Sequence, residues 1–126
     1  MRRYLRTTLA AGLLVSAGSV QAAERQPCKD DPRVLERCFT VHGRLTVHAN
    51  MRPYLWPVGT KRLLGIADPD GAIIMPPELE AAFASDLNRE AFGDFTVCPF
   101  TREAAGHLRL VCIESVSRLV LRERAH

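Results

Sequence analysis

Polar and apolar residues alternate between Cys38 and Ala49, which predicts a β-strand with one buried face. A side-chain period of two is the signature of a strand that packs one side against a core. Gly43 falls on the apolar side, where a glycine favours a strong bend or the close approach of another backbone. The apolar side consists of Phe39, Val41, Gly43, Leu45 and Val47.

The same kind of pattern predicts the elements that follow. Residues 54–58 and 61–67 are short, mostly apolar runs, which predicts a second and a third strand. Residues 68–71, Asp-Pro-Asp-Gly, predict a turn because each of these residue types favours turn geometry. A helix is predicted from Pro76 onward, since proline is well tolerated in a first turn, and residues 88–94 are predicted to form a loop. The apolar stripe of this helix is Leu79, Ala82, Phe83 and Leu87.

Two strands joined by a loop around residues 102–106 are predicted between Phe95 and Leu121. Cys98 and Cys112 are equally distant from Ala105 in this loop, so an antiparallel pairing centred there places them opposite each other. Their Cβ atoms are then about 4.5–5.5 Å apart, close to the roughly 3.5–4.5 Å of a disulfide. This register favours the bridge Cys98–Cys112, and elimination then pairs Cys28 with Cys38. A bridge from Cys38 to Cys98 stays open if their two strands are neighbours.

The first 22 residues have the pattern of a secretory signal peptide. A basic start is followed by an apolar run from Leu9 to Val20 and by the small-residue cleavage pattern that ends at Ala22. An uncleaved anchor and a twin-arginine signal are the alternatives. We therefore expect a periplasmic or secreted protein without a membrane span after cleavage. Residues 23–37 are predicted to be an irregular arm with one helical turn at 33–37, and residues 38–126 to be a single domain.

Charge and cysteine content narrow the class of function. Removal of the signal peptide lowers the Lys plus Arg count from 17 to 14 and leaves 14 acidic residues, so the mature chain is neutral. A nucleic-acid-binding domain is expected to be basic, so nucleic acid is not a predicted partner. An even number of cysteines in an exported chain indicates disulfides. Their spacing does not match the close pairs of a zinc site, and no metal or cofactor is predicted.

Three strands, one helix and two further strands, with Gly43 in the first strand, resemble the OB-fold. The resemblance implies a mainly β, small five-stranded barrel (β-β-β-α-β-β) with one helix, here with disulfide cross-links. A small β-sandwich or another α+β arrangement is the competing architecture. The stretches Cys-Phe-Thr-Val-His-Gly-Arg and Gly-Asp-Phe-Thr-Val-Cys-Pro-Phe-Thr also look like small exported bacterial proteins of unknown function. That likeness implies a compartment and no activity.

Members of the OB-fold group commonly bind oligonucleotides or oligosaccharides on the face of strands two and three. On this chain the resemblance implies a ligand-binding site at Tyr54, Trp56, Lys61 and Arg62. Aromatic rings stack on bases or sugars, and cations hold acidic groups. The alternative interpretation is that Trp56 fills the barrel while Lys61 and Arg62 lie on a solvated turn.

These observations predict a non-catalytic binding module that recognises an envelope glycan or protein. An assembly partner that docks through an exposed strand edge, without a small ligand, is the second hypothesis. A metal or redox role of the cysteines is the third. No catalytic residues are predicted, because the common hydrolase, metalloprotease and phosphate-binding motifs do not occur. His42 and His48 share a strand face but stand about 20 Å apart, too far to bind one metal. The oligomeric state stays undetermined.

Overall fold

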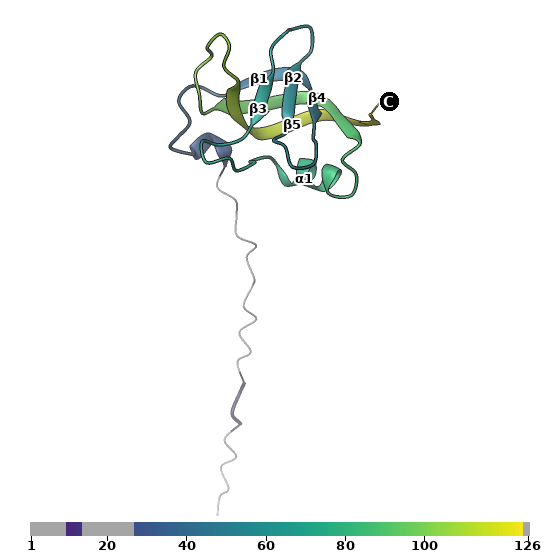
Figure 1. The fold of residues 1–126 in the computed structure, drawn as a ribbon. Coiled ribbons are helices and arrows are strands. Elements are labelled where there is room, and N and C mark those ends of the chain that lie inside the picture. Colours follow the sequence, from purple (N-terminus) through teal and green to yellow (C-terminus); the bar gives the residue numbers. More distant parts are fainter. Residues whose placement is uncertain (1–9, 14–26, 125–126) are drawn as a thin grey trace, which may run out of the picture.

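The computed structural model describes residues 10–13 and 27–124 (Figure 1). The predicted signal peptide and the start of the arm lie outside the described residues, apart from residues 10–13. No helix within the described ranges is long and apolar enough to cross a membrane. The elements, in order, are the 3-10 helix η1 (Cys28–Asp30), β1 (Phe39–Thr46), β2 (Tyr54–Pro57), β3 (Leu64–Ile66), α1 (Pro77–Ala84), β4 (Arg89–Pro99) and β5 (Arg109–Glu123).

The five strands form one sheet that closes on itself in the order β1-β2-β3-β5-β4. Neighbouring strands are antiparallel except β3 and β5, which pair in parallel over three residues. The pairing of β1 with β4 closes the ring. The predicted mainly β, five-stranded OB-like barrel with one helix between the third and fourth strands is therefore confirmed, and a two-sheet sandwich is not formed.

Two glycines face each other on β1 and β4, at a point where β1 also pairs with β2. They allow the sheet to curve there. Gly43 lies directly opposite Gly93. A Cβ atom on Gly43 would stand 3.2 Å from the carbonyl oxygen of Trp56, and one on Gly93 would stand 2.9 Å from that of Ser117. Both positions thus need the absence of a side chain. The predicted close approach of another backbone at Gly43 is confirmed.

The inward faces of the strands and one face of α1 form a single apolar core. Alternation along β1 places Leu45 inside, and its exposed fraction is zero. Leu79 and Phe83 of α1 are buried in the same cluster, so the helix closes one end of the barrel (Figure 1). The buried cluster consists of Leu45, Leu55, Leu64, Ile66, Met75, Leu79, Ala82, Phe83, Ala91, Phe95, Val97, Val111 and Ile113.

The described arm, residues 27–37, is held to the barrel by a cluster of charges. The Arg33 guanidinium donates hydrogen bonds to Asp31, Asp68 and Asp70 at 2.9 to 3.1 Å. Burial alone would raise the pKa of Asp68, but hydrogen bonds from the Ala72 N–H, Arg33 and the Asp70 N–H outweigh it and lower that pKa. These bonds stabilise the ionised carboxylate. Asp68 therefore serves as the fixed anion to which the arm docks.

Three sequence predictions about local structure are wrong. Residues 89–94 are the first half of β4 rather than a loop, because they pair with β1 on one side and β5 on the other. The helix ends at Ala84, so Leu87 lies outside it and is 40% exposed. The arm has its helical turn at Cys28–Asp30 instead of residues 33–37. In the first case, pairing with distant strands overrides a local sequence that contains loop-favouring residues.

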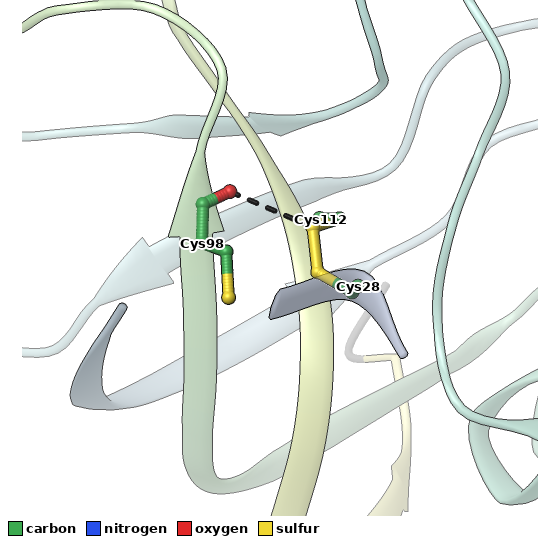
Figure 2. Close-up of side chains that lie close together, drawn as sticks. All are labelled: Cys28, Cys98 and Cys112. Atoms are coloured by element: carbon green, nitrogen blue, oxygen red, sulfur yellow. Dashed lines mark hydrogen bonds between the residues drawn. A yellow bond between two sulfur atoms is a disulfide. The ribbon is translucent and has the colours of Figure 1, made fainter. Parts of the chain in front are cut away.

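The structure forms two disulfides, Cys28–Cys112 and Cys38–Cys98. Cys98 and Cys112 do lie opposite each other on β4 and β5, as predicted, but they are not bonded (Figure 2). The prediction of Cys98–Cys112 and Cys28–Cys38 is therefore wrong, while the alternative Cys38–Cys98 is confirmed.

The reason is the direction in which the backbone N–H and C=O groups of Cys98 point, toward β5 or toward β1. The Phe100 N–H bonds to the carbonyl of Leu110, and by alternation the pair Cys98 and Cys112 is also of the hydrogen-bonded kind, with Cα atoms about 5.5 Å apart. On its other side, toward β1, Cys98 faces Cys38. These two residues form the non-hydrogen-bonded kind of pair, in which the Cα atoms lie closer together. The Cα atoms of Cys38 and Cys98 are accordingly only 4.2 Å apart.

Candidate functional site

A cleft of about 850 Å³ opens at the end of the barrel away from α1. Its walls are the loop between β2 and β3 (58–63) and the loop between β4 and β5 (100–108), which Figure 1 shows standing together at this end. Ligand pockets typically measure about 300–1,000 Å³. The cleft is therefore large enough for a small molecule or a few sugar units.

The floor of the cleft is the unclosed end of the apolar core. Phe39, Val41 and Leu64 line it, and all three belong to, or pack against, the buried cluster. Phe39 and Val41 point inward because they continue the alternation of β1 that buries Leu45. At the other end of the barrel α1 covers the core, whereas here the apolar side chains face the cleft.

The rim of the cleft is cationic. Lys61 is exposed and has no ion-pair partner within the described part of the chain. Arg62, also exposed, pairs with Glu103 across the mouth. Arg109 is only 16% exposed and bonds Glu36 of the arm at 2.9 Å. Three cations and one carboxylate thus line the mouth, and His107 stands beside them.

Arg109 is the most constrained of these cations. Its guanidinium lies over the ring of Phe39, 4.9 Å from the centroid, and its Nε donates to the Thr101 carbonyl at 3.4 Å. The contact with Phe39 extends the aromatic floor into a flat cationic surface. Such a surface suits a ligand that carries both a flat apolar part and an anionic group.

The four residues of the sequence-predicted ligand site separate into two pairs. Lys61 and Arg62 lie on the rim of the cleft. Tyr54 and Trp56 lie on the outer face of β2, half-exposed, with Trp56 opposite Arg44 of β1. The alternative in which Trp56 fills the barrel is wrong, because Leu55 occupies the inward position with zero exposure.

Trp56 nevertheless contacts the cleft loop. Its indole Nε1–H donates to the carbonyl of Thr60 at 2.7 Å, and Thr60 lines the cleft. The Thr60 hydroxyl donates to the Pro57 carbonyl at 2.8 Å, which fixes the turn. The ring of Trp56 is also covered by Arg44, whose guanidinium is 4.8 Å from the ring centroid. Trp56 thus braces the loop that carries Lys61 and Arg62.

The outer face of β1 carries polar side chains, as its alternation predicts. His42 is 64% exposed and contacts Asp94 of β4 at 3.0 Å. The Arg118 guanidinium donates to the same carboxylate at 2.6 Å, and these two bonds, Arg118 first, lower the pKa of Asp94. Asp94 is therefore ionised at neutral pH and is not poised to act as a general acid. His48 contacts Arg124 instead.

Among the described residues, one group of side chains has the proximity of metal ligands. The Sγ atoms of Cys28, Cys98 and Cys112 all lie within 4.8 Å of one another (Figure 2). Each of these sulfurs is in a disulfide, and a metal binds the thiolate. In this oxidised state the cysteines are cross-links.

Sequence reasoning found two of the cleft residues and missed the floor and the second wall. The sequence pattern identified Phe39 only as a buried strand position. It identified His107 and Arg109 only as residues of a hairpin, close to the loop that joins its two strands. Their convergence with Lys61 depends on the parallel pairing of β3 with β5, which begins at Leu64 and Arg109. A short parallel pairing between strands so distant in sequence has no local signal.

The chain matches no protein-family model, no curated protein and no solved structure.

Proposed function

We propose that this chain is an exported, non-catalytic binding module whose cleft holds an acidic glycan of the cell envelope. The observation that carries the proposal is the combination of an apolar, aromatic floor at Phe39 with a rim of Lys61, Arg62 and Arg109. Uronic acid units combine an apolar ring face with a carboxylate. The ring would lie on the floor and the carboxylate would meet the rim.

The size and form of the site favour a glycan over a folded protein partner. A stable protein interface buries about 800 Å² on each side, which needs a broad surface rather than a cleft between two loops. An extended acidic peptide shares the charge of an acidic glycan but lacks the stiff apolar ring face. The acidic peptide is therefore the competing ligand that the experiment must include.

Export to the periplasm or the exterior is part of the proposal. The N-terminal pattern of basic, apolar and small residues supports it. Two disulfides, which fit an oxidising environment, support it as well. Fractionation of cells that express the full chain tests this step, and accumulation of the uncleaved chain in the cytoplasm would contradict it.

The binding experiment uses the mature, oxidised chain and isothermal titration with three probes. These are an oligogalacturonate, a neutral glucan of the same length and a poly-glutamate peptide. We expect the oligogalacturonate to bind more tightly than both other probes. Binding should weaken with added salt, because the contacts on the rim are solvent-exposed ion pairs. Preferential binding of the peptide would overturn the glycan assignment, and binding of none would overturn the site.

Matched variants locate the binding. Lys61→Ala removes a rim cation, and Lys29→Ala removes an exposed cation of the arm that does not line the cleft. An exposed ion pair contributes about 0.2–1 kcal/mol, so Lys61→Ala should weaken binding by a factor of about 1.4 to 5. Lys29→Ala changes the net charge equally and should leave binding unchanged. Equal losses in both variants would indicate a general charge effect instead of the cleft.

A role in assembly is the second candidate function, and one observation favours it. The Ile113 N–H bonds to the carbonyl of Ile74, and beyond this residue β5 has β4 as its only strand neighbour within the described residues. Val120 and Leu121 on this segment are 48% and 40% exposed. Added strands commonly dock on such edges. Analytical ultracentrifugation at micromolar concentrations tests self-assembly, and a strict monomer would count against that form of it.

A further inference from the structure

We infer that the four cysteines form an exchangeable set, and that a small thiol acting at Cys38 shifts the chain to a second connectivity containing Cys98–Cys112. Cys98 lies between two cross-strand neighbours, Cys38 and Cys112. Cys38 continues the register of β1 with β4, in which Phe39 lies opposite Val97. Cys112 lies opposite Cys98 on β5. Cys38, just before β1, thus stands in one row with Cys98 of β4 and Cys112 of β5, and Cys28 reaches the end of the row from the arm.

The two disulfides are close enough for their sulfurs to react with each other. The Sγ atoms of Cys28, Cys98 and Cys112 lie within 4.8 Å of one another. The Cys112 sulfur also stands 3.6 Å from the carbonyl oxygen of Cys98, a contact dashed in Figure 2. Figure 2 shows the Cys98 and Cys112 side chains next to each other on adjacent strands, with Cys28 bonded to Cys112. A thiolate at Cys98 would therefore face the Cys28–Cys112 bond.

The exposure of the four sulfur atoms determines which of them an external thiol attacks first. Cys98 and Cys112 are fully buried and Cys28 is 6% exposed, whereas Cys38 is only partly buried. Thiol–disulfide exchange depends on access to the attacked sulfur. A low-molecular-weight thiolate such as glutathione therefore attacks the Cys38 sulfur. It forms a mixed disulfide there, and Cys98 leaves as a thiolate.

Two further exchanges complete the shift without net oxidation or reduction. The Cys98 thiolate attacks the Cys112 sulfur, so that the Cys98–Cys112 bond forms and Cys28 leaves as a thiolate. The Cys28 thiolate then attacks Cys38 in the mixed disulfide, forms Cys28–Cys38 and expels the glutathione thiolate. Every step breaks one S–S bond and makes one. The product staples the β4–β5 hairpin and removes the covalent link from the arm to β5.

The fold can accommodate the second connectivity. Cys98 and Cys112 are already paired residues on adjacent strands, and the Cα separation of about 5.5 Å for a hydrogen-bonded pair lies inside the 4.4–6.8 Å range of disulfides. The barrel strands need not change register. The change is confined to the arm, which keeps several other ties to the barrel. These include the Arg33 charge cluster, the ion pair of Glu36 with Arg109, and the bonds of the Lys29 N–H to Glu114 and of the Leu35 N–H to the Pro99 carbonyl.

Two single variants with the same bridge removed test the exchange. Cys38→Ala leaves one free thiol at Cys98, inside the three-sulfur cluster. Cys98→Ala leaves one free thiol at Cys38, which is not in that cluster. Both retain Cys28–Cys112 at the start. Each purified variant is incubated at several pH values, alkylated with iodoacetamide and digested with trypsin, which separates the four cysteines because basic residues lie between them.

In Cys38→Ala we expect label on Cys28 as well as Cys98, with loss of the Cys28–Cys112 peptide pair and a matching gain of Cys98–Cys112. The exchange should accelerate as pH rises, since the thiolate is the attacking species, and should not depend on protein concentration. In Cys98→Ala we expect label on Cys38 alone. Label confined to Cys98 in the first variant, or equal scrambling in both, would overturn the inference.

The wild-type chain provides a second measurement that needs no variant to fold. After equilibration in a buffer of reduced and oxidised glutathione, peptide mapping should detect the Cys98–Cys112 and Cys28–Cys38 pairs while far-ultraviolet circular dichroism stays that of the barrel. Recovery of Cys28–Cys112 and Cys38–Cys98 alone would refute the exchange. Appearance of the new pairs only together with loss of the barrel signal would refute it too, because scrambling would then require unfolding.

Discussion

The two disulfides are nested, and this arrangement predicts that their contributions to stability are coupled. Cys38–Cys98 closes a loop of 60 residues inside the 84-residue loop of Cys28–Cys112. A cross-link stabilises the fold mainly by restricting the unfolded chain, and the restriction grows with loop length. At 25 °C the loop formula gives about 4.6 kcal/mol for the outer bridge alone and about 4.3 kcal/mol for the inner bridge alone.

The outer bridge contributes less when the inner bridge is already present. The inner bridge then provides a shorter path from Cys28 to Cys112. The outer bridge closes a loop of only 24 residues along this path, the difference between the separations of 84 and 60. The same formula gives about 3.5 kcal/mol for a loop of that length. Removing Cys28–Cys112 should therefore cost about 1 kcal/mol more in the absence of Cys38–Cys98 than in its presence.

The test is a double-mutant cycle of unfolding free energies in urea. Its corners are the wild type, Cys28→Ala with Cys112→Ala, Cys38→Ala with Cys98→Ala, and the fourfold variant. The loss of both bridges is about 8 kcal/mol, comparable to the whole stability of a small domain. All corners are therefore measured in the same concentration of a stabilising osmolyte. The free energy lost when each sulfur's packing contacts are removed occurs on both sides of the cycle, so it largely cancels in the coupling energy.

The coupling also discriminates between connectivities. Cys28–Cys38 and Cys98–Cys112 would close two separate short loops, each contributing about 3 kcal/mol. With that connectivity each double variant would break both bridges, so the fourfold variant would lose no further bridge and the coupling would have the opposite sign. A coupling of the opposite sign would therefore refute the nested connectivity, and a coupling near zero would refute the loop-entropy reasoning.

Three further predictions concern the barrel. Gly93→Ala should destabilise it by about 1–3 kcal/mol, because the new methyl group would meet the carbonyl of the opposite strand; an unchanged thermal midpoint would contradict this. The lowered pKa of Asp68 stabilises the fold above the unfolded pKa of about 3.9 and loses that effect as pH falls through the folded value. Thermal melts between pH 7 and 3 should show a smaller acid-induced loss in Arg33→Gln, and an identical loss would refute the charge cluster. Arg44→Gln should expose the ring of Trp56 and shift its fluorescence to longer wavelength; unchanged emission would refute the stacked contact.

Local patterns were enough to predict elements whose buried and exposed faces follow from their own alternation of apolar and polar residues. The period of two after Cys38 identified β1, and Gly43 on its apolar side indicated the tight approach that the structure shows against Trp56. The order of elements was enough to indicate the barrel, because few compact arrangements accept three strands, a helix and two strands with short connections.

The failures arise where the environment is set by distant residues. Residues 88–94 contain Asn88 and Gly93, which locally favour a loop, yet two neighbouring strands turn most of the segment into β4. The register of Cys98 with Cys112 was correct, but a register does not say toward which neighbour the backbone hydrogen bonds point. That direction depends on β1, and it decided the disulfide. The cleft likewise depends on the closure of the ring.

The two ends of the barrel are stabilised by different means, and this difference supports the placement of the proposed binding site. At one end α1 covers the core with Leu79 and Phe83, so apolar packing holds the strands together. At the other end no helix covers the core among the described residues, and the Cys38–Cys98 bridge lies beside the cleft. Cys38 directly precedes Phe39 of the floor, and Cys98 lies just before the loop that forms one wall. A binding site needs walls that hold their geometry without the packing that would fill it. The Cys38–Cys98 link beside the open end meets that need, so the proposed change of disulfide connectivity would act next to the proposed ligand site.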